Sequence, residues 1–315
     1  MVSKVNCQTC TQSTDPRCST SALKSLIFGT GIKAAYCNDQ YLVIHTDMTS
    51  GFNNYLSQVP NPPGSVDTAG AACVTRATNP GYALYKIPLN PTPLSTATNT
   101  NNLSGFLGAG DIDGGYLSSG SIIYGLPTRG AVGVSIGGQD IFPVWNNQAL
   151  ATPEKCEVDA CNEHVGGGGG QPHLHGDPFG SWCLYSAANY SSSTVHPPQI
   201  GWSFDGGSIY GRHINTQNLG YSTVLDDCGG HSHDGLAYHY HAQIFTSTTS
   251  SKTNENAKLT NGATYYATTT GPYKCWKNDI SKITNFWKTT NNPDTTVQPC
   301  CQATKVINKY TTPHI

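Results

Sequence analysis

Histidines recur in a repeated pattern that is typical of transition-metal ligands. Residues 159–164 and 226–231 both read D-x-C-x-x-H, and each segment is followed by an H-x-H pair, at 173–175 and at 239–241. Side chains two residues apart on a β-strand point to the same side, with Cα atoms about 6.6 Å apart, so the imidazoles of a pair can converge on one ion. The predicted metal ligands are His164, His173, His175, His231, His233, His239 and His241.

The donor types narrow the choice of metal. Cysteines held in disulfides cannot bind metal as thiolates, which leaves imidazole and carboxylate groups, a set that suits Zn(II), Cu(II) or Ni(II) better than Ca(II). We therefore expect copper or zinc as the cofactor, with Asp159, Asp226 and Asp227 as candidate carboxylate ligands. Two questions stay open: whether the pairs share one site or form two, and whether the histidines are only packed and hydrogen-bonded for structure.

The repetition extends upstream of the histidines. Residues 133–142 match residues 201–210 in their pattern of glycines, hydroxyl groups and apolar side chains. We interpret the units of about 133–175 and 201–241 as an internal duplication. In each unit, a two-residue turn containing glycine lies between apolar segments and predicts a β-hairpin. Tyr238 and Tyr240 alternate with the histidines of the second unit, so they are expected to face the other way, as core or stacking residues.

The cysteine content predicts an extracellular protein. The 315-residue chain has 12 cysteines, an even number typical of a disulfide framework formed in an oxidising compartment, although the pairing cannot be derived from sequence. Two N-x-S sequons, at Asn102 and Asn189, predict glycosylation. The first residues lack the apolar segment of a signal peptide, so secretion implies a leader that this numbering omits.

The low charge argues against two classes of partner. Charged residues make up 11% of the chain and the formal net charge is −2, whereas nucleic acids and anionic membranes require basic patches. No segment approaches the roughly 18 apolar residues that indicate a transmembrane helix. A weakly charged surface favours association, so we expect self-association into an oligomer or fibre, with glycans as further partners.

The chain is predicted to be mainly β. Helical periodicity is scarce, while Gly, Pro, Thr, Tyr and Val dominate, a composition typical of short strands and turns. We expect strands at 41–45, 82–87 and 121–124, short helices near 21–28 and 279–288, and loops at 88–100 and 247–261. The predicted division is an amino-terminal β-rich region (1–120), which is either separate or part of the same domain, a duplicated disulfide-stapled domain (121–280) and a carboxy-terminal segment (281–315).

The second unit resembles the hallmark of the YHYH-domain proteins. Residues 226–242 include Tyr-His-Tyr-His at 238–241, and segments 201–211 and 272–276 resemble the flanking regions of that family. The first unit has Pro-His-Leu-His at 172–175, which keeps both imidazoles and loses the tyrosines, consistent with the histidines being the functional part. The resemblance covers roughly residues 120–280. It implies a secreted or surface-exposed β-rich domain and no particular reaction.

Three functions compete at this point. The leading hypothesis is an extracellular metal-binding glycoprotein with a structural or surface-assembly role. The first alternative is a secreted copper- or zinc-dependent enzyme, in which three or four histidines leave one coordination position open. The second is a carbohydrate-binding module, suggested by Trp145, Trp182, Trp202 and the many tyrosines. A closed set of protein ligands favours the structural role and an open position favours catalysis, so no catalytic residue is assigned.

Overall fold

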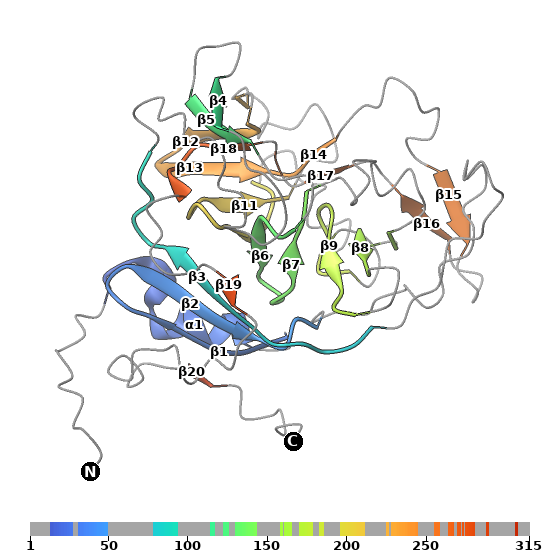
Figure 1. Cartoon of the computed structure of the whole chain (residues 1–315), viewed down its shortest axis with the longest axis horizontal. Coiled ribbons are helices and arrows are strands. Elements are labelled where there is room, and N and C mark those ends of the chain that lie inside the picture. Colours follow the sequence, from blue (N-terminus) through green and yellow to red (C-terminus); the bar gives the residue numbers. More distant parts are fainter. Residues whose placement is uncertain are drawn as a thin grey trace.

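The computed structural model of the chain describes a β-rich fold (Figure 1). Within the described residues the only α-helix is α1 (Thr20–Ile27), which confirms the predicted fold class and the first predicted helix. The described residues are 13–27, 31–49, 78–93, 114–116, 122–125, 130–143, 158–159, 161–165, 170–178, 183–185, 196–211, 225–226, 228–244, 255–258, 264–267, 270–271, 273, 275–280, 288–289 and 306–307.

The first sheet is antiparallel and has five strands in the order β19-β3-β2-β1-β20. Its three long strands are largely apolar and almost entirely buried, because one face packs on α1 and the other on the rest of the molecule. The Cys18–Cys37 disulfide ties the 3₁₀ helix η1 (Pro16–Cys18) before α1 to this sheet. The strands are β1 (Ile32–Cys37), β2 (Tyr41–Thr46), β3 (Ala83–Pro88), β19 (Lys288–Thr289) and β20 (Val306–Ile307).

The second sheet carries most of the predicted metal ligands. It has eight strands in the order β12-β13-β11-β10-β6-β7-β9-β8. All neighbouring strands are antiparallel except the pairs β11–β13 and β7–β9, which are parallel. The strands are β6 (Gly133–Ser135), β7 (Asp140–Ile141), β8 (Glu163–His164), β9 (His173–Leu174), β10 (Gln199–Ser203), β11 (Ser208–Tyr210), β12 (Gly230–His233) and β13 (Leu236–His241).

The two halves of this sheet have the same arrangement of strands, counted outward from the central pair β6 and β10. Each unit forms the predicted hairpin, adds a parallel strand that begins or carries its H-x-H pair, and ends with an antiparallel strand that carries the histidine of its C-x-x-H segment. Asp140 lies opposite His173 just as Ser208 lies opposite His239. The two units therefore share their topology and register. Descent from one duplicated segment stays a prediction, which this agreement supports.

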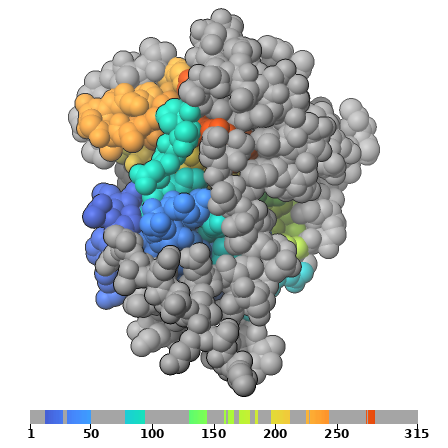
Figure 2. Space-filling model, turned by 60° about the vertical axis from the view of Figure 1, so that its left-hand side comes forward, coloured from blue at the N-terminus to red at the C-terminus, as the bar shows by residue number. Residues whose placement is uncertain are grey.

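The turns of the β6–β7 and β10–β11 hairpins of the second sheet both dock on the first sheet. Gly138 and Gly206 each adopt a φ of 95° at the turn. The hydroxyl group of Thr46 donates a hydrogen bond to the carbonyl oxygen of Gly138 at 2.8 Å, and a Cβ at Gly206 would press on Pro88 at 2.9 Å. Figure 2 shows the segment 78–93 (teal) between β1–β2 (blue) and the β12–β13 region (orange). Buried apolar residues from Cys18 to Ile280 form one cluster across both sheets.

Three smaller sheets complete the described structure. They are β4 (Gly114–Tyr116), β5 (Ile122–Gly125) and β18 (Cys275–Trp276); β14 (Gln243–Ile244) and β17 (Thr270–Gly271); and β15 (Glu255–Lys258) and β16 (Thr264–Ala267). Strand β15 corrects the prediction of a loop at 247–261. The polar segment has no apolar alternation to signal a strand, and it becomes one through backbone pairing with β16.

The remaining predictions have mixed outcomes. The strands predicted at 41–45, 82–87 and 121–124 are confirmed. The helix predicted at 279–288 is wrong at its end, where Lys288 begins β19, and its residues 281–287 lie outside the described part. Asp227 and the sequons Asn102 and Asn189 also lie outside it. The predicted domain boundaries stay a prediction.

Disulfides staple the described fold as predicted. Besides Cys18–Cys37, the bonds Cys161–Cys183 and Cys228–Cys275 each anchor the segment that leads into a cluster histidine three residues later. Within the residues that the structure covers, no helix is both long and apolar enough to cross a bilayer.

Candidate metal centres

The structure gathers histidines into two separate clusters. The five-histidine cluster lies at the β12–β13 end of the eight-stranded sheet, and the three-histidine cluster lies at the β8–β9 end. The two H-x-H pairs therefore belong to separate clusters and do not converge on one shared point. The five-histidine cluster consists of His196, His231, His233, His239 and His241, and the three-histidine cluster consists of His164, His173 and His175.

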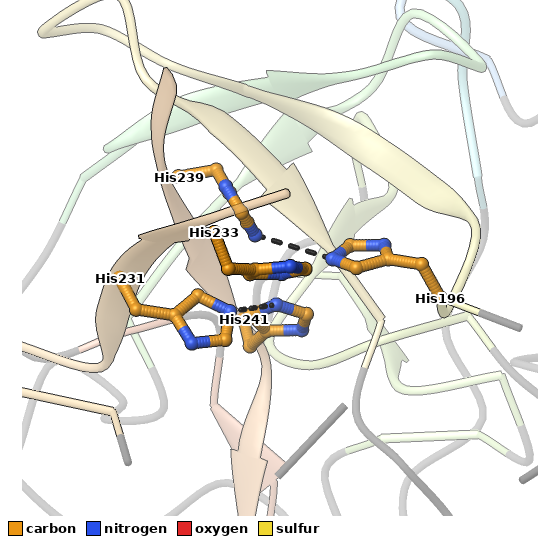
Figure 3. A group of neighbouring side chains, drawn as sticks. All are labelled: His196, His231, His233, His239 and His241. Atoms are coloured by element: carbon orange, nitrogen blue, oxygen red, sulfur yellow. Dashed lines mark hydrogen bonds between the residues drawn. The ribbon is translucent and has the colours of Figure 1, made fainter. Parts of the chain in front are cut away.

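A β-hairpin positions four members of the five-histidine cluster. His231 and His233 alternate on β12, while His239 and His241 alternate on β13, so each pair faces one side of its strand. The connecting turn is Asp234-Gly235, with positive φ at both residues, which is the arrangement that a type I′ hairpin turn requires. Figure 3 shows the fifth ring, His196, entering from the side opposite to His231.

Backbone carbonyl groups fix the protonation of three of these rings. The Nδ1 atoms of His196, His239 and His241 lie 2.9, 2.8 and 2.9 Å from the carbonyl oxygens of Pro197, Ala237 and Gly211. A carbonyl oxygen can only accept, so each Nδ1 carries the hydrogen. In a neutral imidazole the lone pair is then on Nε2. This carbonyl contact on the outer nitrogen is typical of histidines that bind metal through the other one.

The resulting lone pairs face one another. Nε2 of His196 lies 3.1 Å from Nε2 of His239, and Nε2 of His241 lies 3.0 Å from Nε2 of His231. In the pair His196–His239, both neutral rings point a lone pair at the other and neither has a hydrogen to donate. Such a contact is favourable only when a positive charge lies between the nitrogens, either a proton or a metal ion.

Burial disfavours protonation of these histidines, so a proton between the two nitrogens is not expected. Burial lowers the pKa of His239 to about 4 and that of His241 to about 2, and it also lowers the pKa of His196. Neighbouring histidine rings add to the effect in each case. Near neutral pH the three rings are therefore neutral, and their lone pairs are available to a metal ion.

His233 has a nitrogen that protein groups leave unsatisfied. Its Nδ1 contacts the carboxylate of Asp234 at 3.0 Å, while its Nε2 is buried and has no hydrogen-bond partner. A buried polar atom without a partner costs about 1–3 kcal/mol. One ring nitrogen from each of the five histidines lies within 4.8 Å of all the others, so a metal ion within the cluster would satisfy this atom.

The five rings are arranged like the corners of a square pyramid. His239 is the apex, with its ring centroid 4.8 to 5.1 Å from the other four centroids. The other four form a closed ring of neighbours in the order His196, His233, His231 and His241, with sides of 5.2, 4.4, 4.9 and 4.9 Å. Tetragonal nitrogen sets of this kind suit Cu(II) or Ni(II).

In the three-histidine cluster, backbone carbonyl oxygens also contact the outer ring nitrogens, and the inner nitrogens face one another. His173 Nδ1 contacts the carbonyl oxygen of Gln171 at 3.2 Å, and His175 Nδ1 contacts that of Pro143. Their Nε2 lone pairs both face Nδ1 of His164, at 3.0 and 3.2 Å. A single hydrogen on that Nδ1 can serve only one of them, whereas a metal ion can bind all three. Burial lowers the pKa of His175 well below its usual value.

Two of the predicted carboxylates, Asp159 and Asp226, lie outside both clusters. Asp159 accepts backbone hydrogen bonds from Cys161 and Glu163 at 2.8 and 2.9 Å, and it shapes the turn before β8. Asp226 does the same before β12, accepting from the amides of Cys228 and Gly230. Their repeated role is to form the turn that presents the next histidine.

Sequence reasoning found seven of the clustered histidines and missed His196. The missed residue belongs to no H-x-H or C-x-x-H segment, and Thr128 occupies its equivalent position one repeat earlier. It joins the cluster because it precedes β10, and β10 pairs with β11, which lies beside β13. The predicted orientation of Tyr238 and Tyr240 is confirmed: Tyr238 donates to Asp226, and Tyr240 is buried and donates to Asp205.

A family model described as YHYH protein matches residues 84–224. The chain therefore carries a YHYH domain over these residues, which confirms the predicted resemblance. No curated protein and no solved structure matches it in the corresponding searches.

The boundaries of the match differ from the range expected for the resemblance. The YHYH match begins at residue 84, within β3, instead of near 120, and it ends at residue 224, before the Tyr-His-Tyr-His segment at 238–241. It includes the three-histidine cluster and His196. The inclusion of β3 agrees with its packing, because the hydroxyl group of Tyr85 donates to the carboxylate of Asp140 on β7 at 2.6 Å.

Proposed function

We propose that this YHYH-domain protein is an extracellular metalloprotein that holds one transition-metal ion in each histidine cluster. The observation that carries the proposal is the contact between Nε2 of His196 and Nε2 of His239, in which two lone pairs face each other at 3.1 Å. The buried, unpartnered Nε2 of His233 points to the same conclusion independently. The three described disulfides support an oxidising compartment.

Copper is the metal that best fits the five-histidine cluster. Its donors are neutral imidazoles in a tetragonal arrangement, and Cu(II) binds nitrogen donors more tightly than the other divalent ions of the first transition row. Zinc prefers four ligands at the corners of a tetrahedron, so a set of five would leave one imidazole unused.

The role that fits a closed set of five protein ligands is structural. Such an ion has its coordination filled by the protein and would lock the β12–β13 hairpin to the segment before β10. We propose that the metal-stabilised domain serves in an extracellular or surface assembly, as the low content of charged residues, 11%, favours association. Light scattering and electron microscopy on concentrated protein should show oligomers or fibres, and a purely monomeric protein would contradict the assembly role.

Metal analysis tests the central proposal. Protein purified without a chelator or a histidine tag should contain close to two transition-metal ions per chain, one for each cluster. The double variant His239→Ala/His241→Ala should lose one, and His173→Ala/His175→Ala should lose the other. Ser232→Ala, which changes the exposed residue between His231 and His233, is the matched control and should lose none. Folded protein that takes up no metal would refute the proposal.

A second candidate function is that of a secreted metalloenzyme. One observation favours it: the three-histidine cluster offers fewer ligands than copper or zinc requires, as in catalytic sites that hold the metal with three protein groups. The metal would then supply a polarised water molecule, and the histidines would hold and orient it. The carbohydrate-binding alternative gains no support from Trp202, which is buried in the core.

A further inference from the structure

The three-histidine cluster has the shape of one face of a coordination tetrahedron. Its ring centroids form a nearly equilateral triangle with sides of 4.9, 5.1 and 5.1 Å. His164 Nδ1 lies 3.0 Å from the Nε2 of His173 and 3.2 Å from that of His175. Nitrogens bound to zinc in a tetrahedron, at about 2.05 Å from the ion, lie roughly 3.3 Å apart. The three nitrogens therefore converge on one ion from one side, and among the described residues no further histidine joins them.

Comparison of the two units explains why this cluster is smaller. In the second unit His196 and His233 complete the set of five, whereas Thr128 and Gly166 stand at the equivalent positions of the first unit. Threonine is a poor ligand for copper or zinc, and glycine has no side chain. Within the described part of the chain, no cysteine or carboxylate joins the three histidines. The first unit thus has counterparts of His231, His239 and His241 and lacks counterparts of the two side chains that complete the set of five.

One side of the three-histidine cluster approaches solvent. His164 and His175 are buried, at 8% and 1% exposure, but His173 is only partly buried and follows the exposed Gln171. Phe142 stacks on the ring of His173 with centroids 4.1 Å apart and holds its orientation. Next to Gln171, Gly170 has open space where a Cβ would stand. The cluster is therefore most accessible at His173, and we expect a small molecule to approach a bound ion from that side.

We propose that the metal ion held by His164, His173 and His175 carries an exchangeable coordination position that takes a small exogenous ligand, water or hydroxide at rest and a small anion in its place. This inference rests on the proposed function, since it requires that the cluster bind a metal. It assigns different tasks to the two centres: the five-histidine centre is closed and structural, and the three-histidine centre is open and able to exchange ligands.

Azide titration of cobalt-loaded protein tests the exchangeable position. Co(II) substitutes for zinc, and its visible absorption responds to a change of ligand. In the variant His239→Ala/His241→Ala, which keeps only the three-histidine centre, azide should change the spectrum in a saturable manner. In His173→Ala/His175→Ala, which keeps only the five-histidine centre, azide should have no effect. In wild-type protein loaded with two equivalents of Co(II), azide should change only the absorption bands of the three-histidine centre. This measurement tests the proposal even if one of the variants fails to fold.

The outcomes separate the two proposals. If metal analysis finds cobalt at the three-histidine centre and azide leaves its spectrum unchanged, the position is closed and this inference is overturned while metal binding stands. If folded protein binds no cobalt at this centre, both the inference and the proposed function of this cluster fail. A milder variant, His173→Gln, should weaken cobalt binding while the circular dichroism spectrum stays that of the wild type, because this residue is only partly buried.

Discussion

Individual histidines were predictable where local sequence fixes their direction. In each unit the H-x-H and C-x-x-H spacings predicted that three histidines lie together, and the structure gathers them into one cluster, because alternation on a strand and a disulfide-anchored turn are local properties. His196 was not predictable, because its position depends on strand pairings distant in sequence. The same applies to the carbonyl partners of the rings, such as Gly211, which accepts from His241.

The residue that sequence reasoning missed offers the sharpest test of the five-histidine geometry. His196 occupies one basal corner of the pyramid, so His196→Ala should leave four imidazoles and lower copper affinity by about tenfold or more, given that one ligand is lost. Electron paramagnetic resonance of the Cu(II) protein should show a tetragonal signal in the wild type and an altered one in the variant. Unchanged affinity and spectrum would place His196 outside the coordination shell; Ser232→Ala is the control.

At the scale of elements, one residue difference changes how the side chains of the two units pack. Gly230 on β12 corresponds to Glu163 on β8. A Cβ at Gly230 would collide with the hydroxyl group of Tyr238, whereas the first unit has Pro172 at the corresponding place and accommodates the larger side chain. The glycine is therefore matched to the first tyrosine of the Tyr-His-Tyr-His segment. The sequence alone predicted the strands. The contact between this glycine and this tyrosine could be recognised only from the register of β12 and β13 in the structure.

This match predicts a specific coupling between two substitutions. Gly230→Ala should lower the free energy of unfolding by roughly 1–3 kcal/mol because it overpacks the hairpin. Tyr238→Phe alone should also destabilise, since it removes the hydrogen bonds to Asp226 at 3.1 and 3.2 Å. The double variant should lose somewhat less than the sum, because phenylalanine removes the nearest of the colliding atoms while the ring carbon Cζ of residue 238 and the carbonyl oxygen of His239 stay close to the added Cβ. Urea denaturation of the four proteins measures the coupling, and strictly additive losses would contradict it.

At the scale of the whole molecule, the arrangement of sheets lay beyond sequence reasoning. Apolar runs predicted strands, and the repeated turns predicted hairpins, but the parallel pairings β7–β9 and β11–β13 join segments separated by long connections. These pairings send the two H-x-H segments to opposite ends of one sheet. Loop lengths and periodicity carry no information about that choice, so sequence alone left one shared site and two separate sites equally open.

The contact between the two sheets predicts how the molecule unfolds. Thr46 is buried, donates to the carbonyl oxygen of Gly138 and accepts from the amide of Met48 at 2.9 Å. Thr46→Val keeps the shape but leaves those groups unsatisfied, at a cost of about 1–3 kcal/mol. Because one core spans both sheets, we expect a single unfolding transition that moves to lower temperature.

Calorimetry and fluorescence, recorded on the metal-loaded protein, check this expectation. The two probes should give coincident transitions, and Ser25→Ala on the exposed face of α1 should leave them in place. Two separate transitions, only one of them shifted by Thr46→Val, would instead show that the sheets unfold independently.

The interface between β6 and β10 has approximate twofold symmetry. Across it, the amide of Ile136 donates to the carbonyl oxygen of Ile200, and the amide of Phe204 donates to that of Val132. Each unit gives the same contacts that it receives, which is the defining property of an interface between identical subunits. Two separate copies of one such unit that met through the same contacts would carry two identical histidine clusters. Because both units lie in one chain, their sequences need not be identical, and the two clusters differ, with five histidines in one and three in the other.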